Sequence, residues 1–168
     1  MKKKYFGTDG IRGKANSNKM NASLALNIGM ATALPDGNLI VPVIKNADQL
    51  SLLGLVKKVN DLAKRSRNSQ LAPEEVKDGT YTVSNVGVFD TLMGTPIINQ
   101  PQLGVLAFGS IRKEPSVIET NKGDFVGIRK KIILSHSYDH RIINGATGGM
   151  FIKTIKELIE KWDVNQEV

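Results

Sequence analysis

Cysteine is absent from the 168 residues of this chain. A protein without cysteine has no disulfide framework, no thiol nucleophile and no zinc site with thiolate ligands. Aromatic residues make up only 5% of the sequence, whereas proteins that stack nucleic-acid bases need aromatic platforms. No apolar run approaches the roughly 20 residues that span a bilayer, and the start of the chain lacks the apolar stretch of a signal peptide. We therefore expect a cytoplasmic protein with no membrane partner and no nucleic-acid partner.

Basic residues outnumber acidic residues by 23 to 16, which gives a formal net charge of +7. The basic clusters at Lys2–Lys4, Lys64–Arg67 and Arg129–Lys131 are scattered, and acidic residues are interleaved among the basic ones. We interpret these clusters as solvated faces of a globular protein. The content of 40% hydrophobic and 23% charged residues is that of an ordinary soluble domain.

Two segments carry apolar residues at helical spacing. The first runs from Leu52 to Ala63 and has charged residues on its other face. We expect Asn46 to cap this helix, with Gln49 as its capping-box partner. The second helix is expected from Gly145 to about Trp162. Its predicted buried face consists of large apolar residues, namely Met150, Phe151, Ile155, Leu158, Ile159 and Trp162.

Several short β-rich runs lie in the middle of the chain, at residues 39–44, 81–84, 103–108, 116–120, 125–129 and 131–135. Pro42 cannot donate a ladder hydrogen bond, so the first run is an edge strand or carries its proline at an unpaired position. Gly123 and Asp124 are predicted to form a hairpin turn. A strand-rich middle with helices on either side indicates an α+β sandwich.

The chain contains two histidines, His136 and His140. Two histidines at this spacing can bind a metal on a helix. Here the pair straddles a predicted strand end, and no third ligand lies at a suitable spacing, so we expect no metal site. His140 precedes a helix start at Asn144-Gly145. Without cysteine, histidine is the best available general base near neutral pH, and His140 is the candidate.

The segment Ser135–Ala146 closely resembles the His-Arg-x-x-Asp-Gly signature of dihydrolipoamide acyltransferases, the acyl-transferring components of 2-oxo acid dehydrogenase complexes. Three more blocks resemble that family in the same order, at Pro35–Ile44, Gly79–Gly87 and Gly94–Gln102. Residues 27–168 are therefore identified as part of such a catalytic domain. The resemblance implies a chloramphenicol acetyltransferase-like α+β sandwich of a mixed sheet with flanking helices, truncated at the amino end.

The resemblance also implies a reaction, the transfer of an acyl group from acyl-dihydrolipoamide to coenzyme A. His140 would take the proton from the thiol of coenzyme A, and Ser84 would donate a hydrogen bond to the tetrahedral oxyanion. Coenzyme A is then a substrate, the lipoyl group belongs to a separate domain, and no metal is implied. The site of the family lies between subunits of a homotrimer. Trimers build a larger core that works with the other components of the complex.

Asn144 stands where the family has an aspartate that helps to order the site. Asparagine keeps the size and can still form hydrogen bonds, but it has no charge. Another interpretation is that Asn144 caps the helix that begins at Gly145, and the two interpretations are compatible. The alternative function is therefore an inactive assembly fragment, which keeps the acyltransferase fold and the trimer surfaces without catalysis.

The beginning of the chain resembles a different family. Lys4–Asn16 is similar to the amino terminus of a phosphoglucosamine mutase, so residues 1–26 are interpreted as a mutase-like fragment and the chain as a chimera. The phosphorylated-serine motif and the metal loop of the mutase are missing. A sugar-phosphate-binding function is therefore a further hypothesis that rests on this segment alone.

Overall fold

The structure, a computed structural model, describes residues 6–7, 10–11 and 26–163. Near the amino terminus, β1 (Phe6–Gly7) pairs with β2 (Gly10–Ile11) in a small antiparallel ladder. Most of the segment 1–26, to which the mutase resemblance applies, lies outside the described residues.

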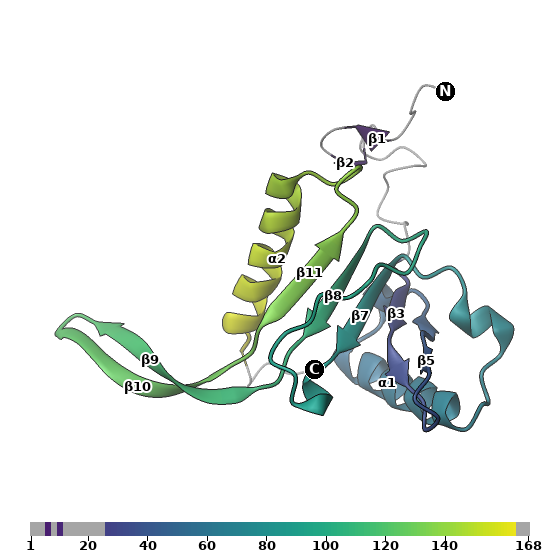
Figure 1. Cartoon of the computed structure of the whole chain (residues 1–168), viewed down its shortest axis with the longest axis horizontal. Coiled ribbons are helices and arrows are strands. Elements are labelled where there is room, and N and C mark those ends of the chain that lie inside the picture. The colour runs from purple at the N-terminus through teal and green to yellow at the C-terminus, as the bar shows by residue number, and fades with distance from the viewer. Residues whose placement is uncertain (1–5, 8–9, 12–25, 164–168) are drawn as a thin grey trace.

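A five-stranded mixed sheet forms the centre of the molecule (Figure 1). Its strand order is β11 (Leu134–Tyr138), β8 (Gly104–Phe108), β7 (Tyr81–Asn85), β3 (Ile28–Met30) and β6 (Val43–Ile44). The three inner strands run parallel to one another, and both edge strands run antiparallel to their neighbours. The sequence correctly predicted the α+β architecture and the positions of β6, β7 and β8. It did not predict β3, and β11 begins at Leu134 and not at Lys131 as expected.

The proline in the run 39–44 divides it into two short strands. β5 (Leu39–Ile40) pairs with β4 (Thr32–Ala33) in a separate ladder, whereas β6 is an edge of the main sheet. Pro42 lies between them and is buried, and its carbonyl oxygen accepts a hydrogen bond from the amide of Met30 at 2.8 Å. Because proline lacks an N–H group, only its acceptor takes part in this pairing.

Helix α1 (Leu52–Arg67) forms as its apolar spacing predicts, but the expected cap is wrong. The N-cap is Ser51, whose hydroxyl oxygen accepts a hydrogen bond from the amide of Gly54 at 3.1 Å. Asn46 instead has a left-handed conformation before the 3-10 turn η1 (Ala47–Gln49) and makes no capping hydrogen bond with its side chain. Asparagine tolerates this conformation, so Asn46 starts the 3-10 turn and does not cap α1.

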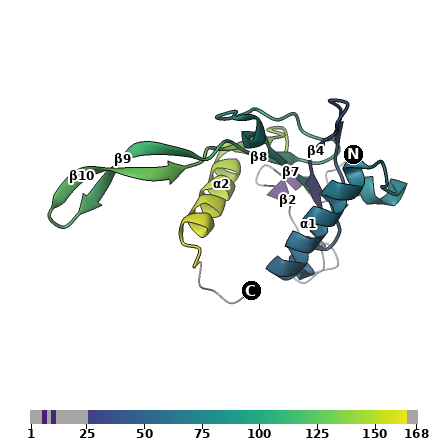
Figure 2. The same ribbon diagram turned by 90° about the horizontal axis from the view of Figure 1, so that it is seen from below.

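Helix α2 (Gly145–Glu160) begins where the sequence predicts, but its apolar face is not buried as expected. Gly148 is the one residue of this helix that is buried within the described part of the chain. Ile155 is partly buried, whereas the other expected core residues range from 41% exposed at Phe151 to 65% exposed at Leu158. The reason is geometric, since α1 and α2 cover the same face of the sheet and nothing in the described chain covers their outer sides (Figure 2).

A long hairpin projects from the sheet (Figure 1). Its strands β9 (Arg112–Thr120) and β10 (Gly123–Lys131) pair antiparallel over their full length and are longer than predicted. The turn consists of residues 121–122, slightly earlier than expected, and Gly123 follows it with a positive φ of 115°. Glycine adopts this conformation without strain, which explains its place beside the turn.

The buried core is small and lies between the sheet and α1. Leu62 of α1 has no exposed surface and packs with Ile44 and Ala47, while Val105 and Leu106 are buried within β8. Short 3-10 turns, η2 (Pro73–Val76) and η3 (Gly87–Phe89), complete the connections around β7. Neither helix of the described residues has the length and apolar character that a bilayer-crossing segment requires.

Candidate functional site

His140 lies on the turn between β11 and α2, as the sequence predicts. The turn is fixed through its backbone. The amide of Asp139 donates to the carbonyl of Leu103 at 2.9 Å, and the amides of Ile142 and Ile143 donate to the carbonyl of Asp139 at 3.0 and 2.9 Å. The imidazole of His140 is exposed, and its ring centroid is 5.6 Å from that of Tyr138. An accessible imidazole on a rigid turn can exchange protons with a bound molecule.

Asp139, which precedes His140 in the sequence, pairs with an arginine. Asp139 forms an ion pair with Arg141, with 2.6 Å between Oδ2 and Nη2. Hydrogen bonds from the side chain and the backbone of Arg141 lower the pKa of Asp139 to about 2. At neutral pH the carboxylate is therefore charged and held by the arginine. This pair stabilises the turn that presents His140.

Asn144 is the N-cap of α2, as one of the two interpretations of this residue predicts. Its side-chain oxygen accepts a hydrogen bond from the amide of Thr147 at 2.8 Å. Loss of such a cap typically costs about 1 kcal/mol of stability. Because α2 follows the turn of His140 directly, the cap also fixes the far end of that turn.

Ser84 is not brought together with His140 within one chain. It lies on β7 and pairs with Ala107 of β8, whereas Tyr138, at the end of β11, pairs with Gly104 at the other end of β8. Standard strand spacings put the Cα atoms of Ser84 and Tyr138 roughly 14 Å apart. Side chains alternate along β7, and Tyr81 contacts α2, so Ser84 faces the opposite side of the sheet.

His136 is a poor candidate for the base. It is enclosed by the rings of Tyr81, Tyr138 and Phe151, with centroid distances between 5.1 and 6.0 Å. Its Nδ1 is buried and has no hydrogen-bond partner among the described residues. Burial lowers the pKa of His136 from its ordinary value, and a hydrogen bond with the backbone of Gly148 acts in the opposite direction. At neutral pH the imidazole is therefore uncharged, and it packs with the surrounding rings.

The partly buried imidazole of His136 makes the stability of the fold depend on pH. Because the folded pKa of His136 lies below its unfolded value of 6.5, the unfolded chain binds the proton more readily, and stability falls as the pH drops below about 6.5. We expect the thermal midpoint of the wild-type chain to fall more steeply between pH 7.5 and 5.5 than that of His136→Phe. Both chains share their other titrating groups, so identical slopes would contradict this prediction.

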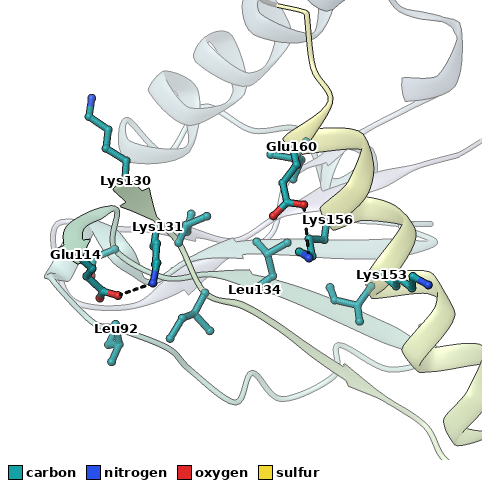
Figure 3. A pocket seen from close by; sticks show the side chains of 13 residues that line it. Leu92, Glu114, Lys130, Lys131, Leu134, Lys153, Lys156 and Glu160 are labelled. Carbon is teal, nitrogen blue, oxygen red and sulfur yellow. Dashed lines mark ion pairs between the residues drawn. The ribbon is translucent and has the colours of Figure 1, made fainter. Parts of the chain in front are cut away.

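A groove of about 620 Å³ lies elsewhere, between the base of the hairpin and the second half of α2 (Figure 3). Apolar side chains form much of its lining, and lysines stand at its rim, where Lys131 pairs with Glu114 at 3.9 Å and Lys156 with Glu160 at 3.5 Å. The groove borders Leu134, at the opposite end of β11 from the turn of His140. We therefore do not assign it to the proton-transfer site.

The described residues contain no group of three or more histidine, cysteine, aspartate or glutamate side chains that could hold a metal ion. The candidate site consists of a histidine on a fixed turn, a capping asparagine four residues later, and a distant serine on β7.

A sequence profile of the family described as 2-oxoacid dehydrogenases acyltransferase (catalytic domain) matches residues 10–165. The chain belongs to this family. The match begins inside the segment 1–26, which on sequence alone resembles a phosphoglucosamine mutase.

Curated relatives are acyltransferase components of several 2-oxo acid dehydrogenase complexes. The dihydrolipoyllysine-residue acetyltransferase component of the pyruvate dehydrogenase complex of Corynebacterium glutamicum is 39% identical over 146 residues, which cover 87% of this chain and 22% of the relative. The dihydrolipoyllysine-residue succinyltransferase component of the 2-oxoglutarate dehydrogenase complex of Bacillus subtilis is 40% identical over 133 residues, 79% of this chain and 31% of the relative. The chain therefore spans less than a third of the length of these two relatives.

Solved structures share the fold. A probable dihydrolipoamide acetyltransferase from Listeria monocytogenes aligns with a TM-score of 0.81 at 34% identity and covers 96% of this chain and 65% of that one. The dihydrolipoamide acetyltransferase of Azotobacter vinelandii aligns with a TM-score of 0.73 at 34% identity and covers 81% of this chain and 54% of that one. A serine, a histidine and an asparagine have been studied for their role in its catalytic mechanism, and the asparagine follows the histidine by four residues.

Proposed function

We propose that this acyltransferase-family chain transfers an acyl group from acyl-dihydrolipoamide to coenzyme A. The observation that carries the proposal is the arrangement of His140 and Asn144 around the end of β11. The histidine stands on a fixed, accessible turn, and the asparagine four residues later caps the next helix. The Azotobacter vinelandii enzyme has a histidine and an asparagine of its mechanism at the same spacing.

This spacing changes the interpretation of Asn144. Asparagine differs from the aspartate that the sequence resemblance leads one to expect, but an acetyltransferase of the family also has asparagine four residues after its histidine. Asn144 is therefore no reason by itself to expect an inactive chain. We propose that it holds the first turn of α2 and, through it, the turn that carries His140.

The proposed reaction needs one proton acceptor and one oxyanion donor. His140 takes the proton from the thiol of coenzyme A, and the thiolate attacks the thioester carbonyl of the acyl-dihydrolipoyl group. The hydroxyl of Ser84 donates a hydrogen bond to the resulting oxyanion. When the intermediate collapses, the carbon–sulfur bond to dihydrolipoyl breaks, and the leaving thiolate recovers the proton from the imidazolium. The products are acyl-coenzyme A and dihydrolipoamide, and the step needs no metal.

The separation of Ser84 from His140 supports an active site shared between copies of the chain. The Cα atoms of Ser84 and Tyr138, two residues before His140, are roughly 14 Å apart, and Ser84 faces the opposite side of the sheet from Tyr81 and α2. Ser84 and His140 of one chain therefore cannot act on one thioester. We propose a homotrimer in which the histidine of one chain meets the serine of the next, within a larger core. One structural relative is the cubic core of the pyruvate dehydrogenase multienzyme complex. The proposed further partners are a lipoyl-bearing domain and the other components of such a complex.

The hairpin supports the same assembly. Val117, Val126 and Ile128 lie on one of its faces, and their exposed fractions are 66%, 74% and 75%. A two-stranded hairpin is marginally stable by itself, and exposed apolar patches of this kind mark interaction sites. A second copy of the chain is the proposed occupant of this face.

Charges on this face of the hairpin are expected to break the assembly. We predict that the double variant Val126→Lys, Ile128→Lys has a lower molar mass by light scattering than the wild-type chain, because buried unpaired lysines are costly at an interface. The variant Thr120→Lys adds the same residue at an exposed position on the opposite face of the hairpin and serves as the control. An unchanged molar mass of the double variant would show that the hairpin face is not part of the assembly.

The direct test of the function is an assay with coenzyme A and acyl-dihydrolipoamide, in which acyl-coenzyme A is measured by chromatography. The proposal requires turnover by the assembled chain. An intact assembly that forms no acyl-coenzyme A would favour the alternative, an inactive assembly fragment that keeps the fold and the trimer surfaces. The exposed apolar faces of α2 and the hairpin are compatible with both outcomes.

Other inferences from the sequence remain predictions. These are the cytoplasmic location, the absence of nucleic-acid and membrane partners, and the chimeric origin of residues 1–26. We attribute no mutase activity to that segment, since the phosphorylated-serine motif is missing from the sequence.

A further inference from the structure

A row of aromatic side chains runs beneath α2 and ends at His140. His136, Tyr138 and His140 stand at alternate positions, and Tyr138 joins the two histidine rings, with centroid distances of 5.2 Å to His136 and 5.6 Å to His140. Behind His136 lie Phe151 at 5.1 Å and Tyr81 at 6.0 Å. The exposed imidazole of His140 is therefore connected, through the ring of Tyr138, to a packed aromatic cluster.

The ring of Tyr138 is held against the backbone of α2. A Cβ atom placed on Gly148 would lie only 2.6 Å from Cε1 and 2.7 Å from Cζ of Tyr138. The helix thus rests directly on one side of the ring, at its one buried position. His136 lies against the ring as well. A side chain packed between a helix backbone and a second ring has less rotamer freedom than an exposed side chain.

His140 has no comparable support of its own. Its backbone is fixed by the hydrogen bonds of Asp139, but within the described residues its imidazole makes no hydrogen bond, and its aromatic contact is with Tyr138. The tips of both side chains point to one place, since His140 Nε2 and Tyr138 Oη each lie 3.9 Å from a Cβ placed on Gly145. The orientation of Tyr138 therefore determines where the exposed imidazole can rest.

We infer that Tyr138 is a positioning residue, whose ring holds the imidazole of His140 in the orientation that takes the proton from the thiol. The inference rests on the proposed acyl transfer. A catalytic group must keep its geometry within about 0.5 Å, supported by neighbours that are themselves locked by packing. Tyr138 meets this requirement through Gly148 and His136. Its hydroxyl is not required, because the contact is made by the ring.

The test compares two substitutions at Tyr138 with one elsewhere in the row. Tyr138→Leu removes the ring and is expected to lower kcat by about 10- to 100-fold, with KM for coenzyme A changed less than about threefold. Tyr138→Phe keeps the ring and is expected to keep kcat within about twofold. Tyr81→Leu is the matched control, since it removes a ring of the same cluster that does not touch His140. It should lower the thermal midpoint and retain kcat.

A second comparison separates positioning from general stability. In a His140→Ala background, Tyr138→Leu should cause no further loss of the residual rate, because the residue acts through the missing imidazole. A further loss there, an unchanged kcat in Tyr138→Leu alone, or an equal loss in Tyr81→Leu would overturn the inference. If the leucine variant does not assemble, Tyr138→Met removes the ring with a longer and more flexible side chain that adapts to the space left by the ring.

The inference can also be tested without turnover. With two histidines in the chain, the imidazole signals of His140 can be identified by NMR through a His136→Phe variant. The ring current of Tyr138 should shift these signals in the wild-type and Tyr138→Phe chains, and the shift should disappear in Tyr138→Leu. If the wild-type chain shows no acyl transfer but this pattern is found, the proposed function fails and the positioning contact stands. Signals that do not respond to Tyr138→Leu would refute the contact itself.

Discussion

Replacing His140 by alanine is expected to lower kcat for acyl transfer by about 10²–10⁴-fold, the usual contribution of a general base. The thiol of coenzyme A carries little thiolate at neutral pH, so without the imidazole most encounters lack a nucleophile. KM for both substrates should change little, because the imidazole acts on a proton rather than on the bulk of either substrate. Initial rates of acyl-coenzyme A formation give both parameters.

The matched control is the other histidine. His136→Phe keeps an aromatic ring between Tyr81, Tyr138 and Phe151, so we expect wild-type kcat from a correctly assembled chain. If His136→Phe abolished turnover and His140→Ala did not, the base would have been assigned to the wrong residue. Molar mass and thermal midpoints for both variants show whether a lost rate reflects chemistry or a lost assembly.

Local patterns predicted the elements that carry the site. The apolar spacing from Leu52 identified α1, and the missing N–H group of Pro42 predicted an edge strand or an unpaired position for the proline. Both predictions depend on residue type and on neighbours in the sequence. The division of this run into β5 and β6 was not predicted. The placement of His140 between a strand and a helix followed in the same way. Asn144 was predicted as a cap because a capping side chain bonds to an amide three residues away, here that of Thr147.

The wrong cap predicted for α1 shows what local sequence patterns do not determine. Asn46 and Ser51 are both suitable caps by residue type, and the periodic pattern does not say which of them starts the helix. The 3-10 turn Ala47–Gln49 occupies the interval, and its burial of Ala47 against Leu62 is a tertiary contact. The choice between the two caps therefore depends on packing that only the folded structure shows.

The exposed face of α2 has a different cause. Apolar periodicity shows that a helix face avoids water, but it does not show whether the cover comes from the same chain or from another. Phe151 packs against Tyr81 and His136 within the chain, whereas Leu158 and Ile159 remain substantially exposed. The support of His140 by Tyr138 was missed for a related reason. The alternation of His136, Tyr138 and His140 was visible, but the contact of the ring with Gly148 depends on the helix folding back over the strand.

The separation of Ser84 from His140 could not be predicted from residue patterns either, since it depends on strand order and register.

The second prediction with a large expected effect concerns Ser84. Ser84→Ala is expected to lower kcat by about 10²–10³-fold, the cost of losing one oxyanion donor. If each site takes His140 from one chain and Ser84 from its neighbour, the two inactive variants are defective in different halves of the site.

Mixing the two variants should therefore restore activity. After the His140→Ala and Ser84→Ala chains are dissociated and reassembled together in equal amounts, an intact site forms wherever a chain with His140 meets a neighbour with Ser84. With random assortment this occurs at roughly a quarter of the interfaces, because each condition is met half of the time in a head-to-tail ring. We expect about a quarter of the wild-type kcat, compared with the near-zero rates of the separate variants carried through the same procedure.

The double variant His140→Ala, Ser84→Ala is the control for this experiment. Mixed with wild-type chain, it places both lesions on one polypeptide and both intact groups on the other, so a shared site forms only between neighbouring wild-type chains. Random assortment again leaves roughly a quarter of the sites active, whereas sites within single chains would leave roughly half. In the first mixture, single-chain sites would restore nothing. A mixture without recovery, in an assembly of wild-type molar mass, would thus place both groups of the site in one chain. It would contradict the strand register, which sets Ser84 roughly 14 Å from Tyr138, two residues before His140.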